Sequence, residues 1–451
     1  MNAPAAHAPL GRSLTVNTVI RRHQIEATRT RSLWEDESEL HSAELVERFS
    51  DAVRQAIPGA RVTWALSWGA ITDTSRRYRD IRRTLARISN EHHDDVAFVP
   101  GGFFANLYGT RDEVNRDIED AVRLLNESFD RPTRSLVAGF LSAQNIAHAR
   151  ELGLRTVQGN IWSQFDIDLQ DGDGSIAYPY YPSRSHFLVP GRGEDRVDAV
   201  QLDGWTVDLV AARTAGMSSE FNSRLGLGPI ETLHRLPRED ALTELYATSE
   251  AHLNERNVER NGMGWLTVNY EISEVARGLA TDPGMLDAWA GWLSGLHQRW
   301  PDLRMPTIAD FGEAWRAAHP DNEALAYLLQ QSGSGVQASR AGETVTWFMT
   351  ADFRLGVVED ADGVSVFDHT SYLTDQREPT ELGDRRWSLL GEINQKRTRP
   401  QDVPVPLHTF LAAHPEIDEA LAARYGSAPE LVALREAAGR ARTASSPRDR
   451  A

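Results

Sequence analysis

Short apolar runs alternate along the chain with longer segments in which apolar residues recur every three or four positions. The runs Leu14–Ile20, Val62–Trp68 and Val96–Val99 predict β-strands, and the segments between them predict helices. Further strands are predicted at Leu136–Ala138, Leu154–Gln158, Val197–Leu202, Trp265–Tyr270 and Leu303–Ile308, and helices at residues 45–57, 75–89, 110–129, 143–152, 240–256 and 285–300. This alternation indicates an α/β protein with seven or eight β/α units, and it favours a (β/α) barrel over an open doubly wound sheet.

The pattern changes after residue 320. Segments of alternating polarity separated by turn residues predict a small β-rich domain over residues 325–405, and helical periodicity returns over residues 406–436. The barrel is therefore assigned to residues 13–320. Residues 1–12 are rich in Ala and Pro, and residues 437–451 are rich in Arg and Ser, so both ends are expected to be disordered.

Composition narrows the range of functions. The chain has 451 residues, a formal net charge of -17 and no cysteine, which excludes thiolate chemistry and argues against nucleic acid and anionic membranes as partners. No apolar stretch approaches the ~20 residues of a membrane span, and the N-terminus lacks the apolar core of a signal peptide, so a cytoplasmic location is expected. No Gly-x-Gly-x-x-Gly turn follows an early strand, so no nucleotide cofactor is expected. A small molecule is the expected partner, and a homo-oligomer is left open.

Acidic and aromatic residues gather in the segment from Trp162 to Tyr181, which follows the predicted strand Leu154–Gln158. Loops at the carboxyl ends of parallel strands build the active sites of such folds. We therefore expect catalytic carboxyls, a substrate platform and a divalent-cation site within this segment. The catalytic candidates are Asp166 and Asp168, the substrate-binding candidates are Trp162, Gln164, Tyr178, Tyr180 and Tyr181, and the cation candidates are Asp171 and Asp173. A surface loop whose Asp and Gly residues form turns, or a purely structural cation loop, are the alternatives.

Three further carboxyls follow predicted strands. Asp73 comes after Val62–Trp68, Asp203 closes Val197–Leu202 and Glu271 directly follows Tyr270. Each is a candidate catalytic acid or base at the mouth of a barrel, and a helix-capping role is the alternative for Asp73 and Glu271.

Histidine and arginine candidates are fewer. His41 and His186 are expected to flank loops at the barrel ends, and Arg224 is a candidate clamp for a hydroxyl-rich or anionic ligand. No His-x-x-x-His or His-Glu-x-x-His pair exists, and neither a Gly-x-Ser-x-Gly elbow nor a phosphate loop is present. A metalloprotease-like or serine-hydrolase site is therefore not indicated.

Several longer runs resemble a bacterial domain family without assigned activity that is placed among the glycoside hydrolase/deacetylase (β/α) barrels. These runs are TWALSW, FVPGGFFAN, WSQFDIDLQDGDGSIAYPYYPS, QLDGWTVD and NSRLGLGPIET. The resemblance covers residues 14–310, and the β-rich part that follows resembles the family's companion domain. It implies a fold related to the polysaccharide deacetylases, which bind a divalent metal with an Asp and a His-x-x-x-His pair. This sequence lacks the histidine pair, although Asp73 occupies a similar early position.

Together, these features favour a hydrolase that acts on a carbohydrate or sugar-like metabolite through carboxylate acid/base chemistry, with a divalent metal as an optional cofactor. One carboxyl among Asp166, Asp168, Asp173 and Asp203 would serve as base or nucleophile, and Glu271 as acid. A carboxylate- or metal-dependent isomerase or lyase on the same barrel, and a carbohydrate-binding protein without turnover, are the alternatives.

Overall fold

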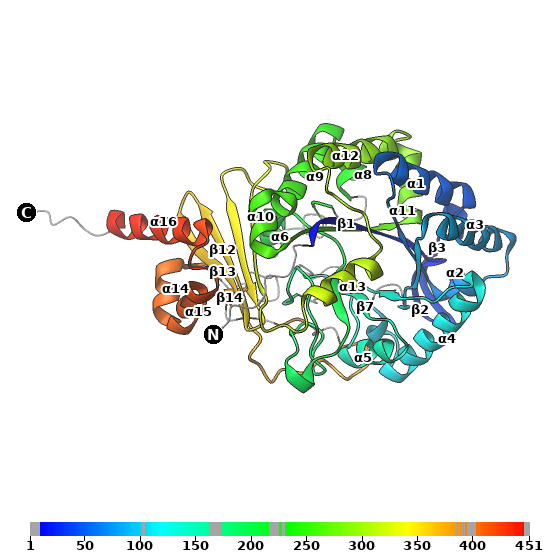
Figure 1. The fold of residues 1–451 in the computed structure, drawn as a ribbon, viewed down its shortest axis with the longest axis horizontal. Helices are drawn as coiled ribbons and strands as arrows, with labels where there is room; N and C mark the ends of the chain where they lie inside the picture. Colours follow the sequence, from blue (N-terminus) through cyan, green and yellow to red (C-terminus); the bar gives the residue numbers. More distant parts are fainter. Residues whose placement is uncertain are drawn as a thin grey trace, which may run out of the picture.

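The computed structural model describes residues 10–101, 104–162, 173–215, 225–227, 231–384, 386–389, 391, 393–394 and 403–445. Figure 1 shows a helix-covered sheet built from the first two thirds of the chain, with a second sheet and the C-terminal helices at one side. No helix of the described part is long and apolar enough to cross a membrane.

Seven parallel strands form the first sheet, in the order β8-β7-β6-β5-β4-β1-β9. Their bounds are β1 Gly11–Ile20, β4 Thr63–Leu66, β5 Asp95–Phe98, β6 Ser135–Val137, β7 Thr156–Asn160, β8 Val200–Asp203 and β9 Met263–Glu271. Almost every strand residue is buried, as expected of a parallel sheet covered by helices. The predicted (β/α) barrel is confirmed, with strands at seven of the eight predicted places.

The barrel is nearly closed. The two edge strands β8 and β9 share no ladder, but the backbone N–H of Thr206 donates to the carbonyl oxygen of Thr267 at 2.9 Å. The N–H of Thr267 in turn donates to Oγ1 of Thr206 at 3.0 Å. The residues just beyond β8 therefore bridge the gap to β9.

The strand predicted at Leu303–Ile308 is wrong. This segment makes one isolated bridge, Ser13 to Arg304, and the helix α13 (Ile308–Ala318) begins at its end. Pro306 lacks the N–H that a ladder requires. Phe311 of α13 stacks on Trp265 at 5.0 Å between ring centroids, so α13 packs against the amino-terminal end of β9.

The helices that cover the barrel follow the predicted amphipathic pattern. In α4 (Arg111–Phe129), Thr110 and Glu113 form the predicted capping box, and Val114, Ile118 and Leu125 lie on its buried face. The other helices of the barrel are α1 Ala43–Ala56, α2 Trp68–Thr72, α3 Arg76–His92, α5 Ala143–Glu151, α6 Leu209–Ala215, α8 Glu231–Arg235, α9 Arg238–Leu253, α10 Glu255–Asn261, α11 Ile272–Thr281 and α12 Met285–Arg299, with short 3-10 turns η1 Ser38–Leu40, η3 Ala105–Leu107 and η4 Gly193–Asp195.

An antiparallel hairpin that the sequence pattern did not predict follows β1. It consists of β2 (His23–Thr28) and β3 (Arg31–Asp36), and only its first strand is substantially buried. Because it leaves the carboxyl end of β1, the hairpin lies at the edge of the barrel where ligand sites form.

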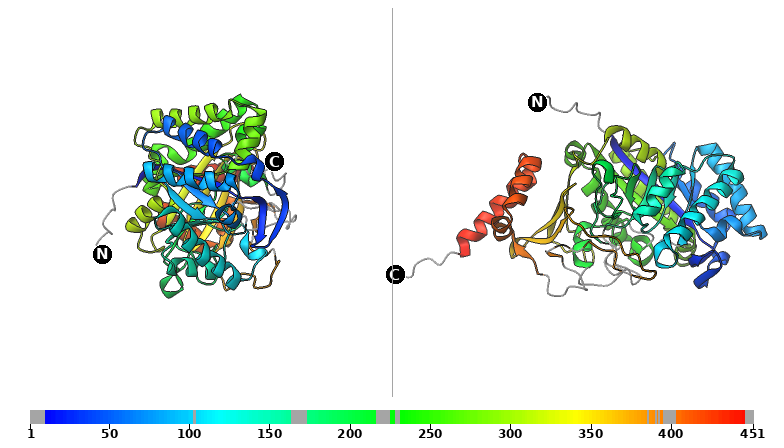
Figure 2. Two further views of the ribbon diagram at one scale, coloured as in Figure 1. Left: turned by 90° about the vertical axis from the view of Figure 1, so that its right-hand side faces the viewer. Right: turned by 90° about the horizontal axis from the view of Figure 1, so that it is seen from below.

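The second sheet is antiparallel, in the order β10-β11-β12-β13-β14, with β15 paired to β13. Its strands are β10 Ala326–Ser332, β11 Thr344–Thr350, β12 Phe353–Asp360, β13 Gly363–Ser371, β14 Ile393–Asn394 and β15 Val405–Pro406. One face contributes Trp347 and Met349 to the core that is continuous with the barrel. The other face packs against the helices α14 Leu407–Ala413, α15 Pro415–Tyr425 and α16 Pro429–Ser445 (Figure 2).

The chain ends are more ordered than predicted. The strand β1 begins at Gly11, inside the segment expected to be disordered, and α16 continues past residue 437 to Ser445. Buried Leu431 and Leu434 attach α16 to the second sheet, so packing against another element stabilises a helix whose sequence is polar.

Candidate functional site

The first and last strands of the barrel place matching polar residues side by side. In the parallel register of β1 and β9, Thr15 pairs with Thr267 and Asn17 with Asn269. The side chain of Gln158 on β7 reaches Thr267 Oγ1 at 3.4 Å, so these residues face the barrel interior. The alternation of side chains along a strand then places Asn17 and Asn269 on the same interior face, one layer nearer the carboxyl ends.

These interior amides lack hydrogen-bond partners among the described residues. Both amide atoms of Asn17, Oδ1 of Asn269 and Oε1 of Gln158 are buried and unpaired there. Leaving such atoms without partners costs free energy, so buried amides in folded proteins bind other protein groups, water or ligand. The layer of Asn17 and Asn269 therefore offers donors and acceptors to a polar molecule at the carboxyl end of the barrel.

Glu271 lies two residues beyond Asn269, at the carboxyl end of β9. Its Oε2 pairs with Arg21 at 2.5 Å, directly after β1, and its side chain keeps 19% exposure. Burial raises the pKa of Glu271, the negative charges of Glu37 and Glu274 raise it further, and Arg21 opposes them. The result is a carboxyl at the barrel mouth that holds its proton to higher pH than an ordinary glutamic acid.

Charged residues surround this carboxyl. Arg277 pairs with both Glu37, at 3.0 Å, and Glu274, at 3.0 Å, while Oε2 of Glu37 is buried without a partner in the described structure. The carboxyls of Glu37, Glu271 and Glu274 and the cations of Arg21 and Arg277 thus form one acid-base cluster.

The predicted candidate His41 lies beside this cluster. Its Nδ1 is 2.9 Å from the hydroxyl of Tyr78, and its ring is buried. Burial, together with the positive charge of Arg21, lowers the pKa of His41 to about 4, so the ring is neutral at physiological pH.

Asp203 ends β8 on the side of the barrel that faces the second sheet. Its Oδ1 accepts the backbone N–H of Trp162 at 3.0 Å, and burial raises the pKa of Asp203 well above the usual range. Nothing in the described contacts brings Asp203 to Glu271, so the two do not form a pair there.

Asp73 supports the local backbone. Its Oδ1 accepts the N–H of Ser75 at 2.6 Å and its Oδ2 pairs with Arg22 at 2.7 Å. Burial alone would raise its pKa, but the hydrogen bonds from Ser75 and the charge of Arg22 lower it. The capping residue of α3 is Ser75 rather than Asp73. Asp73 is therefore an ionised structural carboxylate that orders the turn before α3.

Asp173, predicted as a cation ligand, pairs instead with Arg354 of β12 at 2.8 Å, and both side chains are fully buried. Arg354 also pairs with Asp368 at 2.8 Å and donates to the carbonyl oxygens of Trp162 and Ser175. The guanidinium of Arg354 donates a hydrogen bond to Oδ1 of Asp173, so this ion pair joins the barrel part of the chain to the second sheet.

The predicted aromatic platform is buried and hydrogen-bonded to protein. Trp162 packs edge-on against Trp347, Tyr178 contacts His252 at 3.1 Å, Tyr180 donates to the carbonyl oxygen of Phe187 and Tyr181 to that of His319. All four side chains are at most 3% exposed, so in this conformation they serve the core rather than a surface for substrate. Their apolar bodies explain the burial, and the polar tips find partners there.

His186 is also buried, and burial lowers its pKa to about 3. The predicted candidates Gln164, Asp166, Asp168, Asp171 and Arg224 lie outside the described residues.

The described residues do not fit the metal site that the resemblance implies. Within the described ranges no three His, Asp or Glu side chains are arranged to hold a metal ion. On the interior face of β1, toward its carboxyl end, the chain presents the amide of Asn17, which is a weaker ligand than a carboxylate. We therefore derive no chemical step through a metal.

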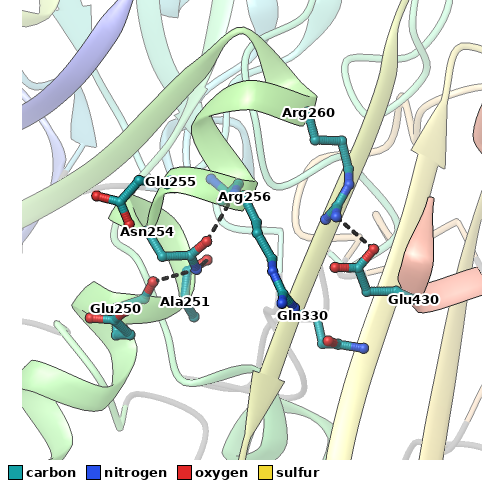
Figure 3. Close-up of a pocket in the computed structure, with 9 residues that line it drawn as sticks. Glu250, Ala251, Asn254, Glu255, Arg256, Arg260, Gln330 and Glu430 are labelled. Carbon is teal, nitrogen blue, oxygen red and sulfur yellow. Dashed lines mark hydrogen bonds and ion pairs between the residues drawn. The ribbon is translucent and has the colours of Figure 1, made fainter. Parts of the chain in front are cut away.

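Hollows open at separate places on the surface. A charged groove of about 440 Å³ lies between α9, α10, β10 and α16 (Figure 3). Across it, Arg260 pairs with Glu430 at 2.5 Å, which fastens α16 to the barrel. A second pocket of about 360 Å³ lies between the β2–β3 hairpin and α4. Its floor includes Trp68 and Phe98, at the carboxyl ends of β4 and β5.

The sequence did not single out Asn17, Arg21 or Asn269. Asn17 lies with Thr15 and Thr18 in the predicted strand Leu14–Ile20, and a polar amide inside a buried strand is the signal that could have revealed it. Asn269 lies two residues before Glu271, so both side chains point to the same face of β9. Their pairing across β1 and β9 depends on contacts between residues about 250 positions apart.

The fold is that of the glycoside hydrolase/deacetylase barrels, in which a nearly closed parallel barrel precedes an antiparallel sheet domain. A protein from Parabacteroides distasonis described as a candidate glycoside hydrolase/deacetylase is 31% identical, with a TM-score of 0.86 over 94% of this chain and 99% of the other. Residues 8–349 match the family described as a domain of unknown function with solved structure, DUF3863, and the chain belongs to it. Residues 354–426 match the similarly described DUF3864.

Other solved structures match with lower identity and lower TM-scores. A candidate polysaccharide deacetylase from Mycobacterium smegmatis is 12% identical, with a TM-score of 0.43 over 70% of this chain and 93% of the other. A GH57 branching enzyme from Thermococcus kodakaraensis is 12% identical, with a TM-score of 0.43 over 67% and 71%. No curated protein matches the chain significantly.

Proposed function

We propose that this protein is a hydrolase of a carbohydrate or sugar-like metabolite, with Glu271 as its general acid. The observation that carries the proposal is the position of Glu271. It combines a raised pKa with partial exposure at the carboxyl end of β9, above the unpaired interior amides. A carboxyl that holds its proton to higher pH than an ordinary glutamic acid is suited to protonating a leaving group.

The interior amides complement such a substrate. Sugar hydroxyls and acetamido groups donate and accept hydrogen bonds, as the side chains of Asn17 and Asn269 do. In the proposed step, Glu271 gives its proton to the leaving oxygen or nitrogen as the bond to carbon breaks, while a water adds to that carbon and gives one proton to a second carboxyl. The sequence predicted this second carboxyl among Asp166, Asp168, Asp173 and Asp203. Because Asp173 pairs with Arg354, we propose one of the other three. Burial raises the pKa of Asp203 well above the usual range, so this carboxyl holds its proton to higher pH and is less available to accept one.

Arg21 is the positioning residue for the acid. Its guanidinium pairs with Glu271 at 2.5 Å and opposes the rise in the pKa of that carboxyl. Removing it frees the carboxyl and raises its pKa further. The ion pair also bears on one alternative: an ionised Glu271 would accept hydrogen bonds from sugar hydroxyls, as a carbohydrate-binding protein without turnover would require.

Turnover of a substrate panel decides between these functions. The panel consists of 4-nitrophenyl glycosides, for C–O cleavage, and N-acetylglucosamine oligomers, for C–N cleavage. We expect Glu271→Gln to lower kcat by at least about 100-fold, because general acid catalysis contributes that much. Glu274→Gln, on the same cluster but paired with Arg277, is the matched control and should retain most activity. Binding of a panel member without turnover by the wild type would favour the binding protein, and equal turnover by Glu271→Gln would refute the assignment.

A further inference from the structure

The pocket beside the β2–β3 hairpin contains an aromatic face that is occupied by the protein's own cation. The guanidinium of Arg29, in the turn of the hairpin, lies 4.0 Å from the ring centroid of Trp68. Trp68 begins α2 directly after β4 and lines the pocket floor with Phe98 and Pro100. A flat indole with a cation over its face is a cation–π arrangement.

Two carboxylates of α4 hold the same guanidinium from the side. Nε of Arg29 pairs with Asp117, and its NH2 lies 2.7 Å from Asp120. The same NH2 donates to the backbone carbonyl oxygen of Arg116 at 2.9 Å. The side chain of Arg29 is 33% exposed, so its ion pairs lie at the surface. Surface ion pairs contribute little to stability, so breaking them costs little free energy.

The other two acids of the pocket are already hydrogen-bonded, and Glu113 is used in the capping box with Thr110. The carboxylate of Glu26 accepts hydrogen bonds from Arg22 N at 2.9 Å, Ser67 Oγ at 2.5 Å and Gly69 N at 2.7 Å. A Cβ at position 69 would lie 2.8 Å from Glu26 Oε1, so glycine permits this close approach. Glu26 thereby fixes the base of the hairpin to the barrel, while Arg29 at its tip is held only by surface contacts.

We propose that the pocket formed by Trp68, Asp117 and Asp120 binds a ligand carrying an ammonium or guanidinium group, and that Arg29 occupies this site until such a ligand displaces it. The pocket volume of about 360 Å³ accommodates a small ring with its substituents. The net charge of -17 favours the approach of a cation.

This inference rests on the proposed function and specifies its substrate class. The pocket opens at the ends of β4 and β5, and β1 separates β4 from β9, which carries Glu271. A sugar chain bound near Glu271 would then place one of its positively charged sugar units over Trp68. The inferred substrate class is a sugar chain with a free amino group.

Two probes of equal length test the charge. Glucosamine tetramer carries ammonium groups at pH 6, and N-acetylglucosamine tetramer is its neutral counterpart. We expect calorimetric titration of the full chain to show binding of the charged tetramer that weakens with added salt, and weaker binding of the neutral one. Equal affinity for both tetramers would overturn the inference, because ring stacking alone would then suffice.

Variants of the two arginines test the displacement. Arg29→Ala should bind the charged tetramer about tenfold more tightly, because the competing guanidinium is gone. Arg116→Ala is the matched control: it removes an equal charge from the same pocket, keeps the carbonyl that contacts Arg29, and should change affinity by less than about twofold. An unchanged affinity in Arg29→Ala, or equal gains in both variants, would overturn the inference.

Trp68 and Asp120 supply the remaining readouts. Trp68→Ala in the Arg29→Ala background should lower affinity about tenfold, the contribution of a partly desolvated cation–π contact. If that variant does not fold, as judged by circular dichroism, Asp120→Asn replaces it, since Asp120 is 42% exposed and should weaken binding without unfolding the chain. Unchanged binding by Asp120→Asn would then refute the site. Loss of the preference for the charged tetramer would count against the pocket alone, and unchanged turnover by Glu271→Gln would count against the acid alone, so failure of the acid and failure of the pocket are separate results.

Discussion

Replacing Arg354 with methionine tests how the two sheets are joined. The side chain is fully buried and contacts Asp173 at 2.8 Å, Asp368 at 2.8 Å and 3.1 Å, and two backbone carbonyls. Methionine is of similar length and fills much of the space, so cavity formation is a minor part of the cost. The main effect is that two buried carboxylates lose their counter-ion.

The magnitude follows from the fate of these carboxylates. Protonating one aspartic acid at pH 7, three units above its ordinary pKa, costs about 4 kcal/mol. Breaking a buried ion pair by removing one partner costs about 3–5 kcal/mol in other proteins. We therefore expect Arg354→Met to lower the free energy of unfolding by about 4 kcal/mol at pH 7, measured by urea denaturation followed by circular dichroism.

Three controls make the measurement decisive. Arg386→Met removes an ion pair with Asp384 whose arginine is 88% exposed, and it should cost less than about 1 kcal/mol. The deficit of Arg354→Met should shrink between pH 7 and pH 4, because the uncompensated acids become protonated. Adding Asp173→Asn should recover part of the loss. A deficit below about 1 kcal/mol, or one independent of pH, would refute the assignment of this network to stability.

Three further predictions concern titration and cation binding. Glu244 and Asp208 are buried and hydrogen-bonded to each other, and burial together with the charge of Asp208 raises the pKa of Glu244. The folded state therefore binds this proton more tightly than the unfolded state does, so the free energy of unfolding falls as pH rises above about 4.5. Glu244→Gln should flatten this decline in pH-dependent unfolding, and an unchanged slope would contradict the prediction. For the proposed hydrolase, activity should decline as pH rises through the pKa of Glu271, and Arg21→Gln should move this alkaline limb to higher pH in the kcat profile; a shift to lower pH would exclude Glu271 as the acid. Because Arg354 pairs with Asp173, we expect Asp173 not to bind Ca²⁺, so added Ca²⁺ should change the thermal midpoints of the wild type and of Asp173→Asn equally. A stabilisation confined to the wild type would restore Asp173 as a cation ligand.

Local patterns predicted most of the barrel. Thr110 and Glu113 marked the start of α4 because a capping box acts within one turn, and the apolar run at Val96–Val99 marked β5 because both of its faces are buried. The β2–β3 hairpin escaped because β3 is exposed on both faces and lacks a period-two pattern. The segment Leu303–Ile308 misled because an apolar run beside Pro306 can pack under a barrel without joining its sheet.

The candidate site, like the fold, was predicted only in part from the sequence. Glu271 was found because its place after a strand is readable from the chain, and the structure adds its partner Arg21 and its raised pKa. Asp173 and the tyrosines attracted attention by their density in sequence. Asp173 is buried against Arg354, 181 positions further along the chain, and Tyr181 donates to His319, 138 positions away, so local density could not predict either contact.

The sequence by itself determined the order of strands and helices, the change to a β-rich part after residue 320 and the family resemblance. These follow from periodicity and capping, which are properties of neighbouring residues. Only the tertiary structure decided which polar groups of the described barrel are buried without partners, which carboxyl at its mouth has a raised pKa, and which cation lies over Trp68. Pairing and desolvation depend on the surroundings that distant segments supply, and periodicity along the chain carries no record of them.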